Sequence, residues 1–138
     1  MRLLGVDLGK SRIGLAVMET ETQLSRPLPA IAAKGALKTD AVQVFAAAQA
    51  EQAEGFVLGL PLEDGIEGKM ASVMRRFGAE LEALGGTVFF VDETLTSVEA
   101  ATALVETGMK ASQRKKRLDS EAACRILDRY MESHVQNG

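Results

Sequence analysis

The chain has 138 residues, of which 46% are hydrophobic and 25% are charged, so it can form one domain with a sizeable core but not two ordinary ones. It has no apolar run that could span a bilayer and no charged leader followed by a cleavage site, so we expect a soluble protein without a membrane partner. The net charge of -3 argues against a protein that binds nucleic acid through its overall charge.

The first third of the chain predicts a β-hairpin and an edge strand. Residues 2–7 and 12–19 are strand-like and are joined by a tight turn around Gly9. Residues 24–33 are expected to be extended, because the two prolines of that segment push their predecessors out of the helical region. Proline cannot donate to a strand ladder, so this segment should lie at an edge of the sheet.

The middle of the chain changes to a helical period and then returns to a strand. Thr39 or Asp40 can cap a helix that runs to about residue 53, and many alanines favour that helix. Its residues on related faces are Val42, Phe45, Ala46 and Gln49. Residues 55–60 form a short buried strand, and residues 61–69 form a loop rich in turn formers and acids.

A second helix and a further strand follow. The helix extends from about Met70 to the glycine pair at 85–86, and the residues on its apolar stripe are Val73, Phe77, Leu81 and Leu84. Residues 87–91 predict a central strand in which both Phe89 and Phe90 are buried.

Two helices are expected in the last third of the chain. One covers about residues 97–106 and ends at Gly108. The other begins near Asp119 and carries its apolar residues at helical spacing, namely Ala123, Ile126, Leu127 and Tyr130. The tail from about residue 134 is expected to fray, and His134 is therefore a poor candidate for a general base.

This order of elements predicts an α/β fold in a single domain over residues 1–138. A hairpin followed by strands that alternate with helices implies a mixed sheet, first antiparallel and then parallel, covered by helices. Cys124 cannot form an internal disulfide and is expected to be a small buried side chain. A lone cysteine indicates a reducing compartment, so we expect a cytoplasmic protein.

Acidic residues follow two of the predicted parallel strands and open the last helix. Asp7 ends the first strand, Asp92 and Glu93 follow residues 87–91, and Asp119 lies on the apolar face of the last helix. Sites in open α/β sheets gather at the carboxyl ends of parallel strands. Each acid also has a structural explanation, as a turn acceptor or a helix cap, and for Asp119 alone capping is the favoured one.

Three carboxylates that converge would repel one another unless a cation lies among them. Hard divalent ions such as Mg²⁺ prefer oxygen ligands. Two such ions could activate a water, hold a scissile phosphate and stabilise the leaving oxygen. The acids therefore predict a site that binds two divalent ions, Mg²⁺ or Mn²⁺. Such a site would hydrolyse phosphodiester bonds.

A basic segment, residues 108–118, contrasts with the acidic remainder of the chain. Its five cations, with no acid among them, are Lys110, Arg114, Lys115, Lys116 and Arg117. On charge alone a solvated loop is the favoured interpretation. Near an acidic site the same loop, with Lys10 and Arg12, could instead guide a phosphate backbone. The sequence leaves open whether Glu63 or Asp64, in the predicted loop at residues 61–69, also binds the metal.

Four ordered segments resemble a known family. These segments are VDLGKSRIGLAV, VLGLPLEDGIEG, VDETLTSVEA and RLDSEAACRIL, which together extend over nearly the whole chain. They resemble the YqgF/RuvX family of RNase H-fold nucleases, whose members are described as Holliday-junction resolvases or pre-16S ribosomal RNA nucleases. The resemblance implies a five-stranded RNase H-like sheet and a divalent-metal site.

The resemblance assigns roles to residues of this chain. The acids of the family's motifs fall on Asp7, Glu93 and Asp119, which are thereby expected to be catalytic and to bind metal. The arginine of the RIG segment falls on Arg12, and a threonine expected near nucleic acid falls on Thr96.

One position departs from the family's pattern. This chain reads DETLT where DERLT is usual, so Thr94 stands in place of an arginine. The change weakens a phosphate contact at that position and leaves the carboxylates untouched.

Two other classes of function compete with a nuclease. The GVDLG hairpin also resembles the phosphate-binding hairpin of actin-like ATP-binding folds, but those need two domains around the nucleotide. A non-catalytic nucleic-acid module is the third hypothesis, and three retained acids without a metal argue against it.

The choice of substrate rests on the resemblance. We expect maturation of the 16S rRNA precursor, with resolution of branched DNA as the alternative, for which a homodimer would suit paired cuts. Tyr130, the single tyrosine, lies on the core-facing stripe, so no stacking platform for single-stranded bases is expected.

Overall fold

The chain begins with the predicted hairpin. The computed structural model describes residues 1–9, 11–63, 65–93 and 111–135. Strand β1 (Arg2–Leu8) pairs antiparallel with β2 (Arg12–Glu19), in a register that sets Asp7 opposite Gly14. The N–H of Gly9 donates to the carbonyl oxygen of Arg12 at 2.9 Å, which closes the turn. A Cβ at Gly9 would lie 2.6 Å from that oxygen, so the turn requires glycine.

Strand β3 (Leu24–Ala32) is the predicted edge strand. It pairs antiparallel with β2 and with no other strand of the described chain. Its two prolines cost little there, because an edge strand has no second neighbour to which their missing N–H groups would have donated.

Helix α1 (Leu37–Ala50) begins earlier than predicted, and of the four residues placed on related faces only Phe45 packs against the core. Its N-cap is Ala36, while Asp40 lies in the first turn, buried, and accepts the N–H of Lys34 at 2.7 Å. The buried residues are Asp40, Ala41, Val44 and Ala48, whereas Val42 is 51% exposed. A helix so rich in alanine has a weak apolar pattern, so the small residues that allow close approach to the sheet decide its orientation.

Strand β4 (Gly55–Glu63) is longer than the predicted strand. It runs parallel to β1 on one side and to strand β6 (Val88–Glu93) on the other. Its last residues form a short hairpin with β5 (Ile66–Glu67), so most of the predicted loop is extended. The turn between them uses Gly65 at φ +78°, a conformation that suits glycine.

Helix α2 (Lys69–Ala83) confirms the predicted burial of Phe77 and Leu81. Leu84 lies past the end of the helix as its C-cap and is 41% exposed, so its predicted burial is wrong. Gly85, at φ +101°, ends the helix where the sequence places the glycine pair.

Strand β6 corrects the prediction of a central strand with two buried phenylalanines. Among the described residues it pairs with β4 alone, and both phenylalanines are half-buried. Phe89 lies against Tyr130, with ring centroids 5.3 Å apart, and Phe90 lies under the guanidinium of Arg75 at 5.1 Å. The apolar run is equally compatible with a strand covered on both faces at the margin of a sheet.

Helix α4 (Ala111–Val135) corrects the start of the last helix. It begins eight residues before Asp119, which is therefore an interior residue and not a helix-opening one. The basic residues at 114–117 are likewise helical and not part of a loop. The sequence from Ala111 to Val135 has no glycine or proline, so nothing in it ends a helix at Asp119. The helix predicted over residues 97–106 lies outside the described residues.

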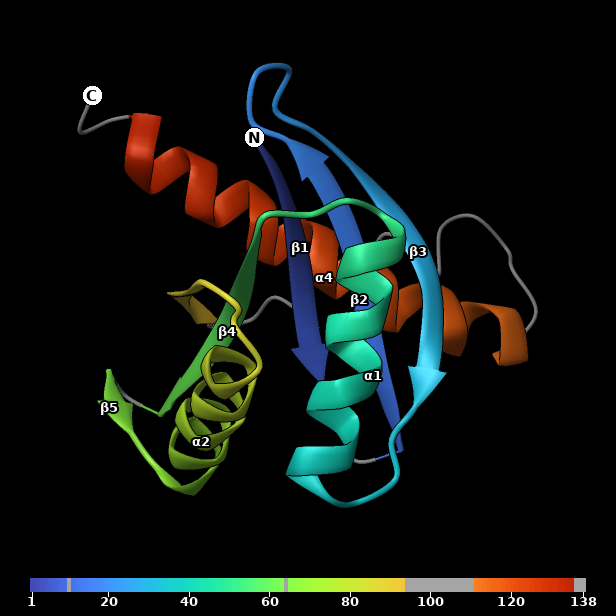
Figure 1. The fold of residues 1–138 in the computed structure, drawn as a ribbon, viewed down its shortest axis with the longest axis vertical. Helices are drawn as coiled ribbons and strands as arrows, with labels where there is room; N and C mark the ends of the chain where they lie inside the picture. Colours follow the sequence, from blue (N-terminus) through green and yellow to red (C-terminus); the bar gives the residue numbers. More distant parts are fainter. Residues whose placement is uncertain (10, 64, 94–110, 136–138) are drawn as a thin grey trace.

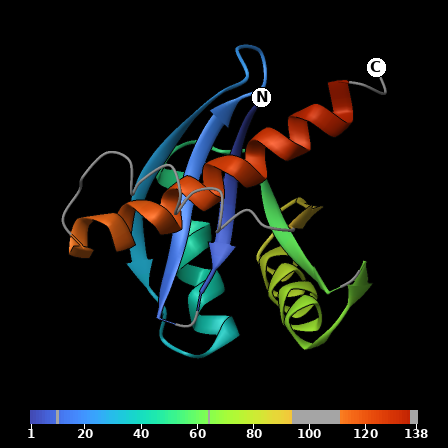
Figure 2. The ribbon, with the colours of Figure 1, turned by 180° about the vertical axis from the view of Figure 1, so that it is seen from behind.

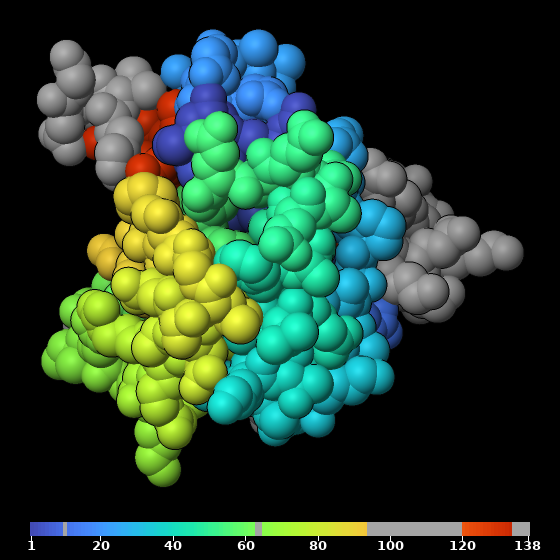
Figure 3. All heavy atoms as spheres, in the orientation of Figure 1, coloured from blue at the N-terminus to red at the C-terminus, as the bar shows by residue number. Residues whose placement is uncertain are grey.

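The elements form three layers. The sheet in the described part of the chain is mixed as predicted, but it has six strands and not the five that the resemblance implies, because the two-residue β5 adds to it. The strand order is β3-β2-β1-β4-β5, and β6 also pairs with β4. Helices α1 and α2 lie side by side on one face (Figures 1 and 3), and α4 crosses the other (Figure 2). Each face has its own buried cluster, one around Phe77 and one that includes Ile126, Leu127, Tyr130 and the buried Cys124. None of the described helices is both long and apolar enough to cross a membrane.

Candidate active site

The site lies on the face of the sheet that α4 covers. Leu3 of β1, Val57 of β4 and Val91 of β6 all pack in the cluster under α4. Side chains alternate along a strand, so Asp7, Gly59 and Glu93 are on that same face. These three positions are near the carboxyl ends of three parallel strands, where the sequence predicts a site.

The two carboxylates come from strands that are not neighbours. Gly5 pairs with Val57, so continuing that register by two residues brings Asp7 level with Gly59. On the other side of β4, Gly59 pairs with Val91, and Glu93 is two residues further. Asp7 and Glu93 nevertheless hydrogen-bond to each other through their side chains. Their carboxyl groups therefore meet above β4.

Glu93 has a strongly perturbed acidity. Burial, the charge of Asp7 and the hydrogen bond to Asp7 together raise the pKa of Glu93 to about 8, with burial the largest cause, while the charge of Arg129 opposes the shift. A carboxyl pair of this kind holds a proton near neutral pH when no cation is bound. In place of that proton a metal ion can neutralise the two groups.

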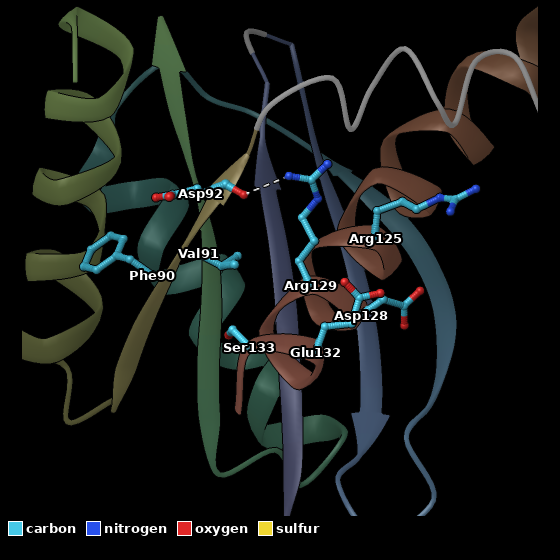
Figure 4. A pocket seen from close by; sticks show the side chains of 8 residues that line it. All are labelled: Phe90, Val91, Asp92, Arg125, Asp128, Arg129, Glu132 and Ser133. Carbon is cyan, nitrogen blue, oxygen red and sulfur yellow. Dashed lines mark hydrogen bonds between the residues drawn. The ribbon is translucent and has the colours of Figure 1, made fainter. Parts of the chain in front are cut away.

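Arg129 of α4 lies close to the end of β6. Its Nη1 donates to the backbone oxygen of Asp92 at 3.3 Å, and Figure 4 shows the side chain extending from the helix toward that strand end. A groove of about 670 Å³ lies between β6 and α4 there. Its charged lining residues are Asp92, Arg125, Asp128, Arg129 and Glu132.

The structure brings together two of the three predicted carboxylates. Asp7 and Glu93 are in contact, whereas the side chain of Asp119 lies outside the described residues, as does that of Glu63. Asp92 is exposed, with its side chain on the opposite face of β6 from Glu93. In the described part of the chain no third acidic, cysteine or histidine side chain joins the pair.

Of the residues predicted to contact nucleic acid, the structure describes the side chain of Arg12 only. Arg12 begins β2, and its Nη1 is buried without a hydrogen-bond partner among the described residues. Lys10, Lys110 and Thr96 lie outside the described residues, and of residues 114–117 only the helical backbone is described.

Sequence reasoning missed the parts played by Gly59 and Arg129. The sequence predicted a strand at Gly59, but not that both acid-bearing strands flank this strand. The strand register would have revealed this, but register depends on pairing between distant segments. Arg129 is one of several charged residues on the last helix, and no pattern distinguishes it.

The donor set fits a hard divalent cation. Asp7 and Glu93 offer carboxylate oxygens, which Mg²⁺ and Mn²⁺ prefer over nitrogen or sulfur. The half-buried pair already needs a positive charge or a proton between its members.

Relatives of this chain have closely similar lengths. A chain from Anaeromyxobacter dehalogenans (strain 2CP-C), with the provisional name pre-16S rRNA nuclease, is 38% identical and covers 96% of this chain and 97% of its own length. One from Lactococcus lactis subsp. cremoris (strain MG1363), with the same provisional name, is 33% identical over 97% of this chain and 96% of its own length.

Solved structures share the fold. The Thermus thermophilus RuvC in complex with a Holliday junction substrate superposes with a TM-score of 0.62 at 15% identity, covering 100% of this chain and 98% of the other. A Fowlpox virus resolvase in complex with Holliday junction DNA gives 0.56 at 16% identity, covering 98% and 99%. These likenesses confirm the RNase H-like fold that the sequence predicts.

The sequence profile described as "RuvX: Holliday junction resolvase" matches residues 1–133. Together with the relatives, this match confirms the resemblance seen in the motifs, and the chain belongs to the RuvX family.

Proposed function

We propose that this protein is a divalent-metal-dependent nuclease. The observation that carries the proposal is the contact between Asp7 and Glu93, two carboxylates from non-adjacent strands with the pKa of Glu93 raised to about 8. Structural acids rarely converge in this way, whereas active sites often do. Membership of a family described by its resolvase activity supports the same conclusion.

Asp7, Glu93 and Asp119 would hold Mg²⁺ or Mn²⁺. Bound there, such ions supply a Lewis acid and an activated water for phosphodiester hydrolysis. Asp119 is included because it matches an acid of the family's motif. It lies on α4 four residues before the buried Ala123, and residues at this spacing share a face of the helix. Arg12, with a buried donor that lacks a partner among the described residues, is well suited to a phosphate oxygen. Lys10, Thr96 and the cations at 114–117 are proposed to contact the nucleic-acid backbone.

RNA in maturation of the 16S rRNA precursor is the proposed substrate. The provisional names of relatives that match along nearly their full length support it. Cleavage of branched DNA is the second candidate, favoured by the fold shared with two resolvases in complex with Holliday junctions. A resolvase would act as a homodimer, whereas RNA processing needs a single site.

We also infer that residues 1–138 act as one cytoplasmic nuclease domain. Both buried clusters pack on the same sheet, so neither could form a core without it.

Cleavage of labelled single-stranded RNA and of a labelled four-way DNA junction tests the proposal. With Mg²⁺ or Mn²⁺, we expect the wild type to cut at least one substrate and Asp7→Asn to lose more than about 100-fold in rate, beyond what outer-shell changes cost. The exposed Glu82→Gln on α2 is the matched control and should cut normally. A folded, metal-supplied wild type that cuts neither substrate would overturn the nuclease assignment, and the preferred substrate decides between the two candidates.

A further inference from the structure

Gly59 is the residue above which the two carboxylates meet. The strand order puts β4 between β1 and β6. Neighbouring strands are about 4.8 Å apart, and Glu93 lies two residues further along its strand than the residue level with Asp7, so the backbones of Asp7 and Glu93 are separated by more than roughly 10 Å. Two carboxyl groups that span this separation must come together in the space where the residue of the middle strand would project its side chain.

The space above Gly59 is already filled by the Glu93 carboxyl group. A Cβ built at Gly59 would lie 2.5 Å from Oε2 of Glu93 and 2.8 Å from its Cδ. The remaining close atom is Cδ1 of Ile126 in α4, also at 2.8 Å. The carboxyl group of Glu93 therefore lies directly against the backbone of β4. Only glycine at position 59 leaves this space free, because every other residue has a Cβ.

We infer that Gly59 is a positioning residue, whose missing side chain provides the place in which the Glu93 carboxyl group meets Asp7. The inference rests on the proposed function, because the role of Gly59 is to let the carboxyl groups of Asp7 and Glu93 approach as closely as a shared metal ion requires. Gly59 acts through Glu93 and touches neither metal nor substrate itself.

A methyl group at this position should disturb the site more than the fold. Both atoms of Glu93 that it would meet are at the far end of a flexible side chain near the edge of the sheet, so the carboxyl group can move away. Ile126 is fully buried and has less freedom. By contrast, a Cβ at Gly5 would meet the backbone oxygen of Ala123 at 2.7 Å, where the helix itself would have to move.

Gly78→Ala is the matched control for Gly59→Ala. A Cβ at Gly78 would lie 2.8 Å from Cζ of Phe90, which is again the end of a side chain of β6, but on the face covered by α2. Both variants thus crowd the end of a β6 side chain; Gly59→Ala also crowds Ile126 of α4, and of the two only Gly59→Ala crowds a carboxylate.

The first measurement is Mn²⁺ binding by calorimetry, followed by cleavage of whichever substrate the wild type cuts. We expect Gly59→Ala to fold, to lose about tenfold or more in Mn²⁺ affinity, as changes behind metal ligands do, and to need more metal for cleavage. Gly78→Ala should bind Mn²⁺ as the wild type does. Unchanged Mn²⁺ affinity in Gly59→Ala beside a wild type that binds and cuts would overturn the inference and leave the nuclease assignment standing.

If the wild type does not bind Mn²⁺, a second measurement without metal tests the role of Gly59 separately from the nuclease assignment. The unfolding equilibrium constant is measured for Gly59→Ala alone and in the Glu93→Ala background. Removing the crowded group should reduce the effect of Gly59→Ala on the unfolding equilibrium constant by roughly two- to a hundredfold, the usual coupling of residues in contact, and leave that of Gly78→Ala unchanged. An equal effect of Gly59→Ala in both backgrounds would show that Glu93 does not occupy the space above Gly59.

Discussion

Glu93 makes the stability of the metal-free protein depend on pH. The folded state raises the pKa of this carboxyl group from 4.5 to about 8, so between these values the folded protein holds a proton that the unfolded chain has lost. The stabilisation is complete below about pH 4.5 and is lost as pH rises to about 8. We therefore expect the free energy of unfolding in urea, with a chelator present, to fall from pH 5 to pH 8.

Two comparisons isolate the group responsible. Glu93→Gln cannot ionise, so its urea midpoint should change much less over the same pH range. Saturating Mg²⁺ should also remove the fall in the wild type, because the ion replaces the proton as the positive charge of the site. An equal fall in wild type and Glu93→Gln would assign the pH dependence to other groups.

At the scale of elements, the contact between β1 and α4 depends on Gly5. A Cβ there would lie 2.7 Å from the backbone oxygen of Ala123 and from Cγ of Leu127. Because α4 would have to move, we expect Gly5→Ala to lower the free energy of unfolding by about 2–3 kcal/mol, the upper part of the range for overpacking. Urea unfolding measures the change.

Gly55→Ala in β4 is the control for Gly5→Ala. Its Cβ would meet the ends of the Leu3 and Phe89 side chains at 3.0 and 3.2 Å and a backbone oxygen only at 3.6 Å, so it should cost clearly less. Equal losses in the two variants would mean that α4 adapts easily over β1.

The elements also separate what the sequence could predict from what it could not. The hairpin around Gly9, the edge strand and the end of α2 at Gly85 follow from local turn chemistry and were predicted correctly. The buried face of α1 and the position of β6 at the margin of the sheet depend on packing between distant segments; the first was not predicted, and β6 was wrongly predicted to be central. The start of α4 was wrong because a good capping residue, Asp119, can also lie inside a helix.

The candidate site divides in the same way. Asp7 and Glu93 were found because acids at the ends of apolar strands are conspicuous in sequence. That they meet above Gly59 could not be predicted, because it requires the register of three strands and the absence of one side chain.

On the scale of the whole molecule, the net charge of -3 is combined with a cluster of cations that is proposed to bind nucleic acid. Four consecutive cations, residues 114–117, lie on the first turns of α4, the helix that also carries Asp119. Each phosphate that they neutralise releases counterions, so affinity for single-stranded RNA should fall with salt at a log–log slope of about -3 for four contacts. Fluorescence anisotropy with Asp7→Asn, which we expect to bind without cutting, measures this slope.

Replacing the four cations at 114–117 by glutamine in that background should reduce the magnitude of the slope by about 3 and weaken binding, leaving the smaller contribution of Lys10 and Arg12. The control replaces three cations of α2 on the other face of the sheet, Lys69, Arg75 and Arg76, and should retain most of the slope, although it makes the whole molecule more acidic by a similar amount. If both sets of replacements reduced the slope equally, overall charge and not the position of these cations would govern binding. A slope that only the α4 set reduces would instead mean that RNA approaches the site along this helix, from the face of the sheet on which Asp7 and Glu93 meet.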